Sequence, residues 1–392
     1  MLFSPSPTII LFTISFSLSI LSSSFVSAIS IGVIRWDDWY NTSSNPNDSG
    51  LAIQRALSPL QWRDRVPWFC EILPTTNITC NNNQRTIIDQ EIQLAVENNI
   101  NFWAFDTYPN DTSLAVSRLM YMNSTSPYKQ YLQWCHLLQT GWITQGGLDA
   151  WPLKIAEYVN NFNRSDYYKI KDTVTGELRP LIFLFSMYEN AWDSTGWKSW
   201  ITALTMLNNA SIAYGAGRPY YAVQTFVVSD GWSIMQNINN NNPNKDTWLL
   251  SALSSYAVVG GAYYPIGGNY SDLIQANINF WNEIKDTTQA DIVVPLTAGW
   301  DPRPMNETNL PWQNYTDPRW TQQPTLEQLN NFTTLAIQWS KNNPNVNPSQ
   351  TILISAWNEY AEGHWIGPVF PEYGGTDRLV TIGQAIKNFT NA

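Results

Sequence analysis

Short apolar runs alternate with amphipathic segments along most of the chain. The runs are rich in β-branched and aromatic residues, which is typical of buried strands. They cover residues 29–36, 100–108, 130–138, 180–187, 220–228, 256–265, 291–300 and 351–359. Helical periodicity is clearest at residues 87–98, 150–162, 197–214, 272–284 and 326–341. Repeated strand–helix units in this number predict an α/β fold, a (β/α)8 TIM barrel.

The barrel is expected to form one domain, because no linker and no internal repeat divides residues 29–392. Residues 41–83 and 305–324 are long for connections between a strand and a helix, so we expect them to form loops over the catalytic face. A doubly wound open sheet is the alternative architecture. It is less favoured because no glycine-rich phosphate loop follows the first run.

Residues 1–28 are typical of a secretory signal peptide. Apolar and hydroxyl-bearing side chains fill residues 9–25, and Val26-Ser27-Ala28 fits a small-residue cleavage site. An uncleaved anchor is the alternative, because the segment has no Lys or Arg, but its serines make a poor membrane span. We therefore expect a secreted or secretory-pathway luminal protein without membrane association after cleavage. The C-terminus carries no retention tetrapeptide, which favours secretion.

Asparagine sequons recur along the chain and fit export through a glycosylating pathway. They lie at Asn41, Asn47, Asn77, Asn110, Asn123, Asn163, Asn209, Asn269, Asn306, Asn314, Asn331 and Asn388. Such a compartment is oxidising, so Cys70 and Cys80 are expected to form a disulfide. Cys135 lies in an apolar run and is expected to be a buried free thiol.

The composition narrows the class of ligand. Only 13% of the residues are charged and the net charge is −10, whereas nucleic-acid binding needs a basic surface. The chain has 20 Trp and 19 Tyr, and those rings that do not fill the core offer faces on which sugars stack. Two histidines and no Cys/His cluster predict neither a metal site nor another cofactor. We expect a monomer that acts on an oligosaccharide or polysaccharide.

In a TIM barrel the functional side chains follow the carboxyl ends of the strands, which meet on one face. Acids, amides and aromatic rings dominate these positions, as recognition of a neutral sugar requires. The candidate substrate-binding residues are Trp36, Asp37, Asp38, Asp106, Tyr108, Tyr188, Glu189, Tyr263, Trp300, Asp301, Arg303, Trp357 and Asn358. Asp301 and Arg303 either bind substrate or form a structural ion pair, and His136 is interpreted as satisfying a hydrogen bond in the core or at the rim.

The last apolar run ends in Ser355-Ala356-Trp357-Asn358-Glu359-Tyr360-Ala361-Glu362-Gly363. We expect Glu359 at the last position of the strand and Glu362 in the first turn beyond it. Two neighbouring carboxyl groups resist simultaneous ionisation, so one can act as an acid while the other acts as a base. Enzymes that cleave glycosidic bonds typically use such a pair of carboxyl groups. Glu189, after the fourth run, is the alternative catalytic acid.

Two segments resemble known families. The segment from Trp357 to Gly363 resembles the WNEWxEG signature of glycoside hydrolase family 99 (endo-α-mannosidases and endo-α-mannanases) and of the related WbsX-like domains of polysaccharide clusters. Upstream, Gly299-Trp300-Asp301-Pro302-Arg303 resembles the block beginning Gly-Trp-Asp that these families carry before the paired glutamates. The resemblance is specific for the last third of the chain.

The resemblance implies a TIM barrel that hydrolyses an α-linked glycan, such as an α-mannan, with retention of configuration. It assigns Glu359 as the base that deprotonates the sugar's own 2-hydroxyl, which forms a 1,2-anhydro sugar, and Glu362 as the acid/base. The chain departs from the family pattern at residues 364–368, where a further acid is absent, and at residues 35–40, which lack a tyrosine-rich opening. These departures affect the expected mannose-type substrate more than the paired-glutamate chemistry.

Two other functions stay open at this point. One is a carbohydrate-binding barrel without catalytic activity, which the presence of both glutamates disfavours. The other is a glycan-modifying transferase of the WbsX-like type, which the lack of a visible nucleotide-sugar site disfavours.

Overall fold

The computed structural model describes residues 29–37, 39, 48–75, 77–80, 85–173, 175–243, 248–259, 266–308 and 319–390. The predicted signal peptide, Asp38 and Tyr263 lie outside these residues. Within them, no helix is both long and apolar enough to span a bilayer.

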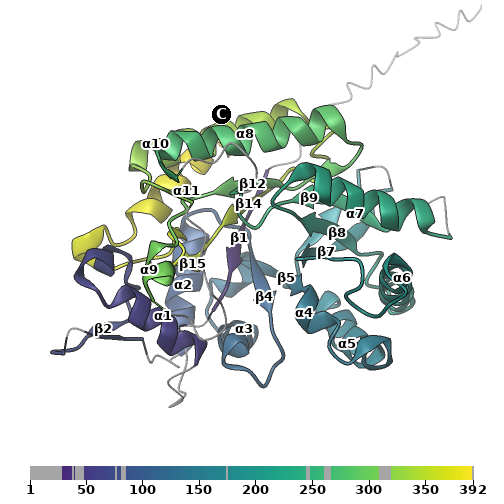
Figure 1. Cartoon of the computed structure of the whole chain (residues 1–392), viewed down its shortest axis with the longest axis horizontal. Coiled ribbons are helices and arrows are strands. Elements are labelled where there is room, and N and C mark those ends of the chain that lie inside the picture. The colour runs from purple at the N-terminus through teal and green to yellow at the C-terminus, as the bar shows by residue number, and fades with distance from the viewer. Residues whose placement is uncertain are drawn as a thin grey trace, which may run out of the picture.

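Nine parallel strands form a nearly closed barrel (Figure 1), which confirms the predicted architecture. Their order around the barrel is β11-β9-β8-β7-β5-β4-β1-β14-β12. The two end strands, β11 (Asp291–Ile292) and β12 (Val294–Thr297), are consecutive in the chain and are separated only by Val293. They therefore act as one interrupted strand that pairs with β9 on one side and β14 on the other. Counted in this way, the barrel has eight strands, as a TIM barrel does.

The other barrel strands follow the predicted runs closely, with one exception. They are β1 (Ser30–Arg35), β4 (Phe102–Thr107), β5 (Gln133–Gln139), β7 (Leu178–Phe185), β8 (Tyr220–Gln224), β9 (Leu250–Ser254) and β14 (Thr351–Ser355). The sixth strand was predicted at residues 256–265, and this prediction is wrong, because β9 lies a few residues earlier in Leu250–Ser254. Tyr256 instead begins a buried loop that enters the site described below.

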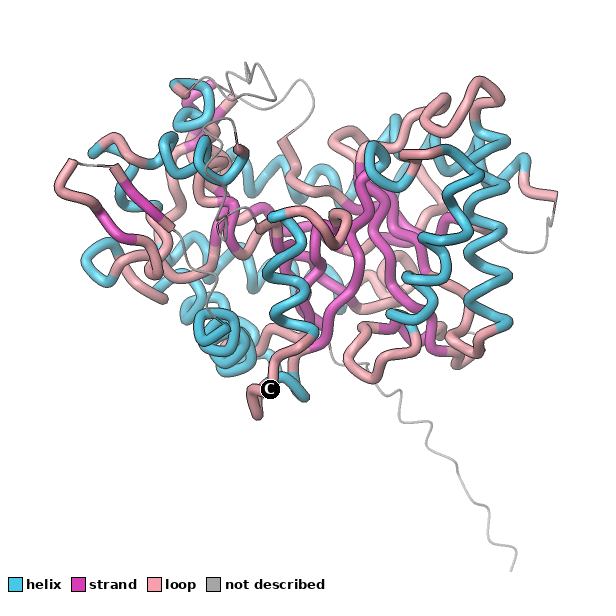
Figure 2. Tube along the Cα trace, turned by 90° about the horizontal axis from the view of Figure 1, so that it is seen from below, coloured by secondary structure: helices cyan, strands magenta, loops and turns pink. Residues whose placement is uncertain are grey.

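Helices cover the outside of the strands (Figures 1 and 2). They are α1 (Ser49–Leu57), α2 (Arg85–Glu97), α3 (Val116–Met122), α4 (Thr140–Ile143), α5 (Gly147–Phe162), α6 (Trp197–Ala213), α7 (Val228–Asn241), α8 (Tyr270–Thr287), α9 (Arg303–Glu307), α10 (Leu326–Asn342) and α11 (Asp377–Thr390). The five predicted helices correspond to α2, α5, α6, α8 and α10, with ends displaced by a few residues. Capping boxes start α8 at Asn269 and α10 at Thr325, so both helices begin where their side chains satisfy free backbone N–H groups.

Smaller strands extend from this frame. Three pairs are β2 (Glu71–Ile72) with β3 (Ile78–Thr79), β10 (Ile266–Gly268) with β13 (Trp320–Thr321), and β15 (Asn358–Glu359) with β16 (His364–Trp365), while β6 (Lys169–Lys171) pairs with β7. The β2–β3 hairpin lies beside the disulfide between Cys70 and Cys80, which confirms that predicted pair. Cys135 is a buried free thiol, as expected.

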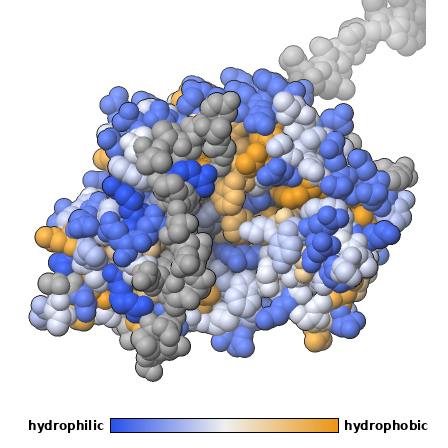
Figure 3. Space-filling view, viewed as in Figure 1, coloured by the Kyte–Doolittle hydropathy of each residue, from blue (hydrophilic) through white to orange (hydrophobic). Residues whose placement is uncertain are grey.

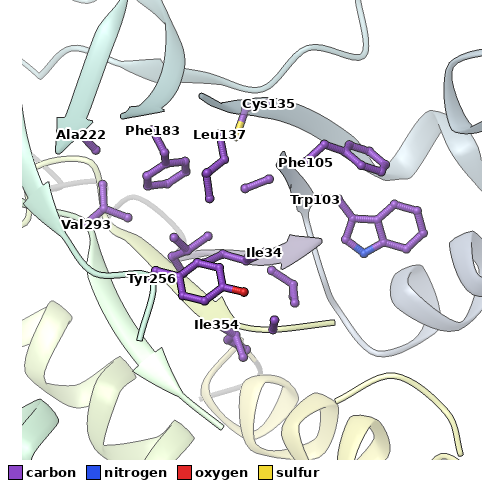
Figure 4. Close-up of a cluster of buried hydrophobic side chains, with 14 of the residues drawn as sticks. Ile34, Trp103, Phe105, Cys135, Leu137, Phe183, Ala222, Tyr256, Val293 and Ile354 are labelled. Carbon is purple, nitrogen blue, oxygen red and sulfur yellow. The ribbon is translucent and has the colours of Figure 1, made fainter. Parts of the chain in front are cut away.

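The barrel strands are buried on both faces, which is why their sequences are continuously apolar rather than alternating. Ile34 of β1, Leu137 of β5, Phe183 of β7 and Ile354 of β14 belong to one buried cluster (Figure 4). Tyr256 joins the same cluster from the loop after β9. This packing holds the carboxyl ends of the strands in fixed positions and so supports the groups that follow them.

Candidate active site

The two candidate catalytic glutamates lie on a hairpin that follows β14. The strand ends at Ser355, and β15 and β16 then pair antiparallel with Glu359 opposite His364. Glu362 lies in the turn between them. The prediction that Glu359 occupies the last position of the barrel strand is therefore wrong, because a separate hairpin carries both acids. The hairpin brings them to the same cavity.

Glycine is required in this turn. Gly363 has φ +77°, and a Cβ there would lie 2.6 Å from the backbone nitrogen of Asp301. The same nitrogen donates a 2.7 Å hydrogen bond to the carbonyl of Glu362. The hairpin and the segment after β12 thus meet backbone to backbone, which fixes the position of the Glu362 backbone in the site.

We expect Gly363→Ala to destabilise the protein and to reduce its activity, because the new methyl group must push Asp301 away from Glu362. Gly147→Ala is a matched control, since Gly147 has φ +66° but open space around its missing Cβ. The control isolates the cost of the left-handed conformation, about 1–2 kcal/mol. Chemical denaturation should give a larger loss for Gly363→Ala than for the control. Equal losses would show that the close backbone approach has no energetic weight.

A cavity of about 850 Å³ opens in front of the hairpin. The face drawn in Figure 3 is hollowed near its centre, beside a band of hydrophobic side chains. The described lining residues are Trp36, Asp48, Ser49, Ile53, Asp106, Tyr108, Leu114, Gln139, Trp142, Phe185, Ser186, Phe226, Tyr256, Trp300, Met305, Glu359 and Glu362. Aromatic rings and carboxyl groups dominate this set, and no described lining residue carries a positive charge. Such a cavity suits a neutral or cationic sugar better than an anionic one.

Glu359 is a buried acid with one strong partner. The Tyr256 hydroxyl donates a 2.6 Å hydrogen bond to its Oε1. Burial raises the pKa of Glu359 well above its usual value, and the charge of Glu362 adds to the rise, while the bond from Tyr256 opposes it. The two glutamates therefore resist being ionised together, and in the substrate-free site the proton favours Glu359.

Glu362 is partly exposed to the cavity and contacts a histidine. Its Oε2 lies 2.8 Å from His364 Nε2, and His364 Nδ1 lies 2.5 Å from Ser355 Oγ. Carboxyl oxygens of Glu359 and Glu362 and a ring nitrogen of His364 all lie within 4.8 Å of one another. The two acids thus form a close pair, as in retaining glycosidases.

A third acid, Asp106, lines the same cavity near the end of β4. Its Oδ2 accepts hydrogen bonds from Gln139 Nε2 at 2.6 Å and from the Tyr108 hydroxyl at 3.2 Å. The Tyr108 hydroxyl in turn accepts one from Trp36 Nε1 at 2.7 Å. Asp106 Oδ1 is buried and has no partner among the described residues. Because an unpaired buried oxygen is unfavourable, this atom is well suited to form a hydrogen bond with a sugar hydroxyl.

Burial raises the pKa of Asp106 to about 7, although hydrogen bonds from Gln139 and Tyr108 lower it. Since the native state holds this proton more tightly than the unfolded chain, its stabilising effect is lost as the pH rises from about 4 to 7. The size of the effect is about 4 kcal/mol. Relative to Asp106→Asn, which does not titrate, the wild-type free energy of unfolding should fall over that range. Denaturation curves at several pH values test this, and parallel curves for the two proteins would contradict it.

The structure brings together six of the fifteen predicted site residues. Those that line the cavity are Trp36, Asp106, Tyr108, Trp300, Glu359 and Glu362. Tyr188 and Glu189 are exposed and do not line it. Asp38 and Tyr263 lie outside the described residues. The remaining predicted residues do not line the cavity and form two groups: Asp37, Trp357 and Asn358 in one, and Asp301 and Arg303 in the other.

The first group belongs to a buried charge network. Arg35 contacts Asp37 at 2.6 Å and Glu91 at 2.7 Å, and each of these three side chains is at most 3% exposed. Trp357 Nε1 donates to Glu91 at 3.0 Å, and Asn358 Nδ2 donates to Asp37 at 2.6 Å. The network thus ties β1 and α2 to the residues before Glu359, and it positions the hairpin.

The second group surrounds Asp301, which is fully buried. Arg65 and Arg303 both bind its carboxylate, and together they lower its pKa against the effect of burial. The Arg303 guanidinium lies 3.5 Å from the centre of the Trp320 ring. Neither Asp301 nor Arg303 lines the cavity, so this arrangement matches the structural ion pair rather than the substrate-binding alternative.

Several lining residues were missed from the sequence, chiefly Gln139, Trp142, Phe185 and Tyr256. Gln139 and Phe185 are the last residues of β5 and β7. A search for functional residues at the carboxyl ends of strands therefore finds them once the strand limits are known. Tyr256 was hidden by the misplaced sixth strand. His136, by contrast, is buried in the core between Thr107 and Asn161, in accord with its interpretation.

A metal ion is chemically possible at one place. Glu359, Glu362 and His364 are the group of potential ligands that the described residues offer. Two carboxylates and an imidazole suit several divalent cations. In the structure these three side chains form hydrogen bonds, from Tyr256 to Glu359 and between His364 and Glu362.

Comparisons with known proteins bear on the fold. No protein-family model matches the sequence, and no curated protein does. Among solved structures, the glycoside hydrolase family 99 endo-α-mannosidase from Bacteroides thetaiotaomicron, in complex with BIS-TRIS-propane, is similar, with a TM-score of 0.57 and 12% identity over 92% of this chain and 97% of that one. A second structure of that enzyme gives 0.55 and 13% over the same shares. The chain therefore has the fold of a family 99 glycosidase.

Proposed function

We propose that this protein is a glycoside hydrolase that cleaves an α-linked glycan with retention of configuration. The observation that carries the proposal is the close pair Glu359 and Glu362 in a cavity lined by aromatic rings. The glycosidase fold supports it, and so does the motif around the two glutamates. An α-mannan is the first substrate to test, because the structural neighbours are endo-α-mannosidases.

The site supplies what the proposed reaction needs. Glu359 takes the proton of the sugar's 2-hydroxyl, which attacks the anomeric carbon and forms a 1,2-anhydro sugar, and Glu362 protonates the departing oxygen. A neighbouring hydroxyl is already in place, so little entropy is lost in bringing up a nucleophile. Glu362 then takes a proton from the water that opens the anhydro ring, and Glu359 returns its proton to the 2-oxygen of the sugar.

The roles require that the proton shared by the pair moves when substrate binds. In the free site it favours Glu359, whereas the reaction starts with Glu359 ionised and Glu362 protonated. A bound sugar can cause this change, because its 2-hydroxyl donates to Glu359 and its glycosidic oxygen accepts from Glu362. Both hydrogen bonds stabilise the reactive distribution of the proton.

Reducing-end release from α-mannans, α-glucans and high-mannose glycans tests the activity. We expect release from at least one of them by the wild type, and none by Glu359→Gln/Glu362→Gln. Addition of EDTA should leave the rate unchanged, because the proposed chemistry uses no metal. Glycan binding without release would favour a carbohydrate-binding protein, and a lengthened glycan would favour a transferase.

Export through the secretory pathway is part of the proposal. Of the sequon asparagines that the structure describes, Asn77, Asn110, Asn123, Asn163, Asn209, Asn269, Asn331 and Asn388 are exposed, and Asn306 is half-buried. Exposed sequons are accessible to glycosylation, and the disulfide between Cys70 and Cys80 fits an oxidising compartment. Expression in a eukaryotic host, followed by glycosidase digestion and a gel shift of the protein recovered from the medium, tests this part.

A further inference from the structure

The imidazole of His364 connects the end of β14 to the proposed acid. His364 is fully buried, and its two ring nitrogens lie 2.5 Å from Ser355 Oγ and 2.8 Å from Glu362 Oε2. Its ring packs against Tyr256 and Trp300, with ring centres 5.4 Å and 5.1 Å away. The ring is thus held at both nitrogens and by two aromatic neighbours, so its orientation is fixed.

We propose that His364 is a positioning residue for Glu362, an inference that rests on the proposed function. The Ser355 hydroxyl donates to Nδ1, which keeps the ring proton on Nε2, and Nε2–H donates to Glu362 Oε2. A buried serine at the end of a barrel strand is a rigid partner, because β14 pairs with β1 and β12 on its two sides. The tautomer is therefore set by the barrel itself.

This arrangement helps the acid in two ways. With Oε2 engaged, the reactive proton is held on Oε1, and the plane of the carboxyl group is fixed. When that proton passes to the departing glycosidic oxygen, Glu362 becomes a carboxylate, and the bond from Nε2–H becomes charge-assisted. The bond is then stronger in the transition state than in the ground state, which is the condition for a contribution to the rate.

His364 itself neither gains nor loses a proton. Glu362 gives its proton to the leaving group and later takes one from the attacking water, while Nε2–H stays in place throughout. The hairpin register supports this role, because His364 lies directly opposite Glu359 and so shares one rigid unit with both acids. If His364 only filled space, its substitution would instead slow the cleavage of every substrate by the same factor.

The dependence of the rate on the leaving group distinguishes a positioning role of His364 from a space-filling one. The test compares an α-manno-oligosaccharide, whose sugar leaving group needs protonation, with the matched oligosaccharyl fluoride, whose fluoride leaves without it. His364→Phe keeps a ring of similar size but removes the donor, and His364→Gln restores an N–H. We expect His364→Phe to lower kcat/KM for the oligosaccharide by about 100-fold and for the fluoride by only a few-fold, with partial recovery in His364→Gln.

Ser355→Ala provides a second variant that leaves the ring in place. It frees the tautomer and should impair the oligosaccharide selectively, by about ten-fold, while Ser355→Thr should recover activity. If His364→Phe does not fold, the two Ser355 variants test the inference in its place. Equal losses on both substrates, or no loss, would overturn the inference. A wild type that is inactive on both substrates would instead count against the proposed function, so the two failures are distinguishable.

Discussion

Glu362→Gln should lower kcat/KM for glycan cleavage by about 10²–10⁴-fold, the usual contribution of general acid–base catalysis. Glutamine keeps the shape of the side chain and the contact with His364 but has no acidic proton to give to the leaving oxygen. Initial rates of reducing-end release measure the effect. Glycan binding, measured separately by calorimetry, should change little because the cavity keeps its form.

Glu189→Gln is the matched control for this experiment. Glu189 is exposed and does not line the cavity, yet it follows a barrel strand and was the alternative catalytic acid. We expect Glu189→Gln to retain wild-type activity. Activity that survives in Glu362→Gln but collapses in Glu189→Gln would overturn the assignment of the paired glutamates.

Arg35→Met should destabilise the protein by about 3–5 kcal/mol, because it leaves Asp37 and Glu91 buried without their cation. Methionine fills most of the space of the arginine chain, so the loss reports the charges rather than a void. Chemical denaturation of wild type and variant at pH 7 measures the loss.

The double variant Arg35→Met/Glu91→Gln should recover part of the lost stability, because it removes one stranded carboxylate. A deficit that is unrelieved in the double variant would contradict the electrostatic explanation. Activity should fall together with stability, since Trp357 and Asn358 connect this network to Glu359.

Much of the fold was predictable because the barrel strands are buried on both faces. Runs such as Ile352-Leu353-Ile354 stand out against the polar helix faces, and their repetition predicts the TIM barrel. The sixth strand was misplaced because Tyr256–Val259 is as apolar as a strand but is buried as a loop. Hydrophobicity reports burial, and it does not distinguish a buried strand from a buried loop.

The site was less predictable, because strand ends alone do not tell which side chains face the cavity. Asp37 and Asp106 both lie near strand ends, yet Asp37 binds Arg35 in the buried charge network, while Asp106 lines the cavity. The role of His364 was also hidden, because its contact with Glu362 depends on the β15–β16 hairpin. The paired glutamates were found because their spacing and their Trp-Asn context are local features of the sequence.

The most direct test of the central claim is the configuration of the first product, followed by proton NMR during cleavage of an α-mannan or another α-linked glycan that the wild type accepts. The proposed route inverts the anomeric carbon twice, once when the 2-hydroxyl attacks and once when water opens the anhydro ring, so the α-anomer should appear first and only later mutarotate. A first product in the β-configuration would show a single displacement by water and would contradict the account.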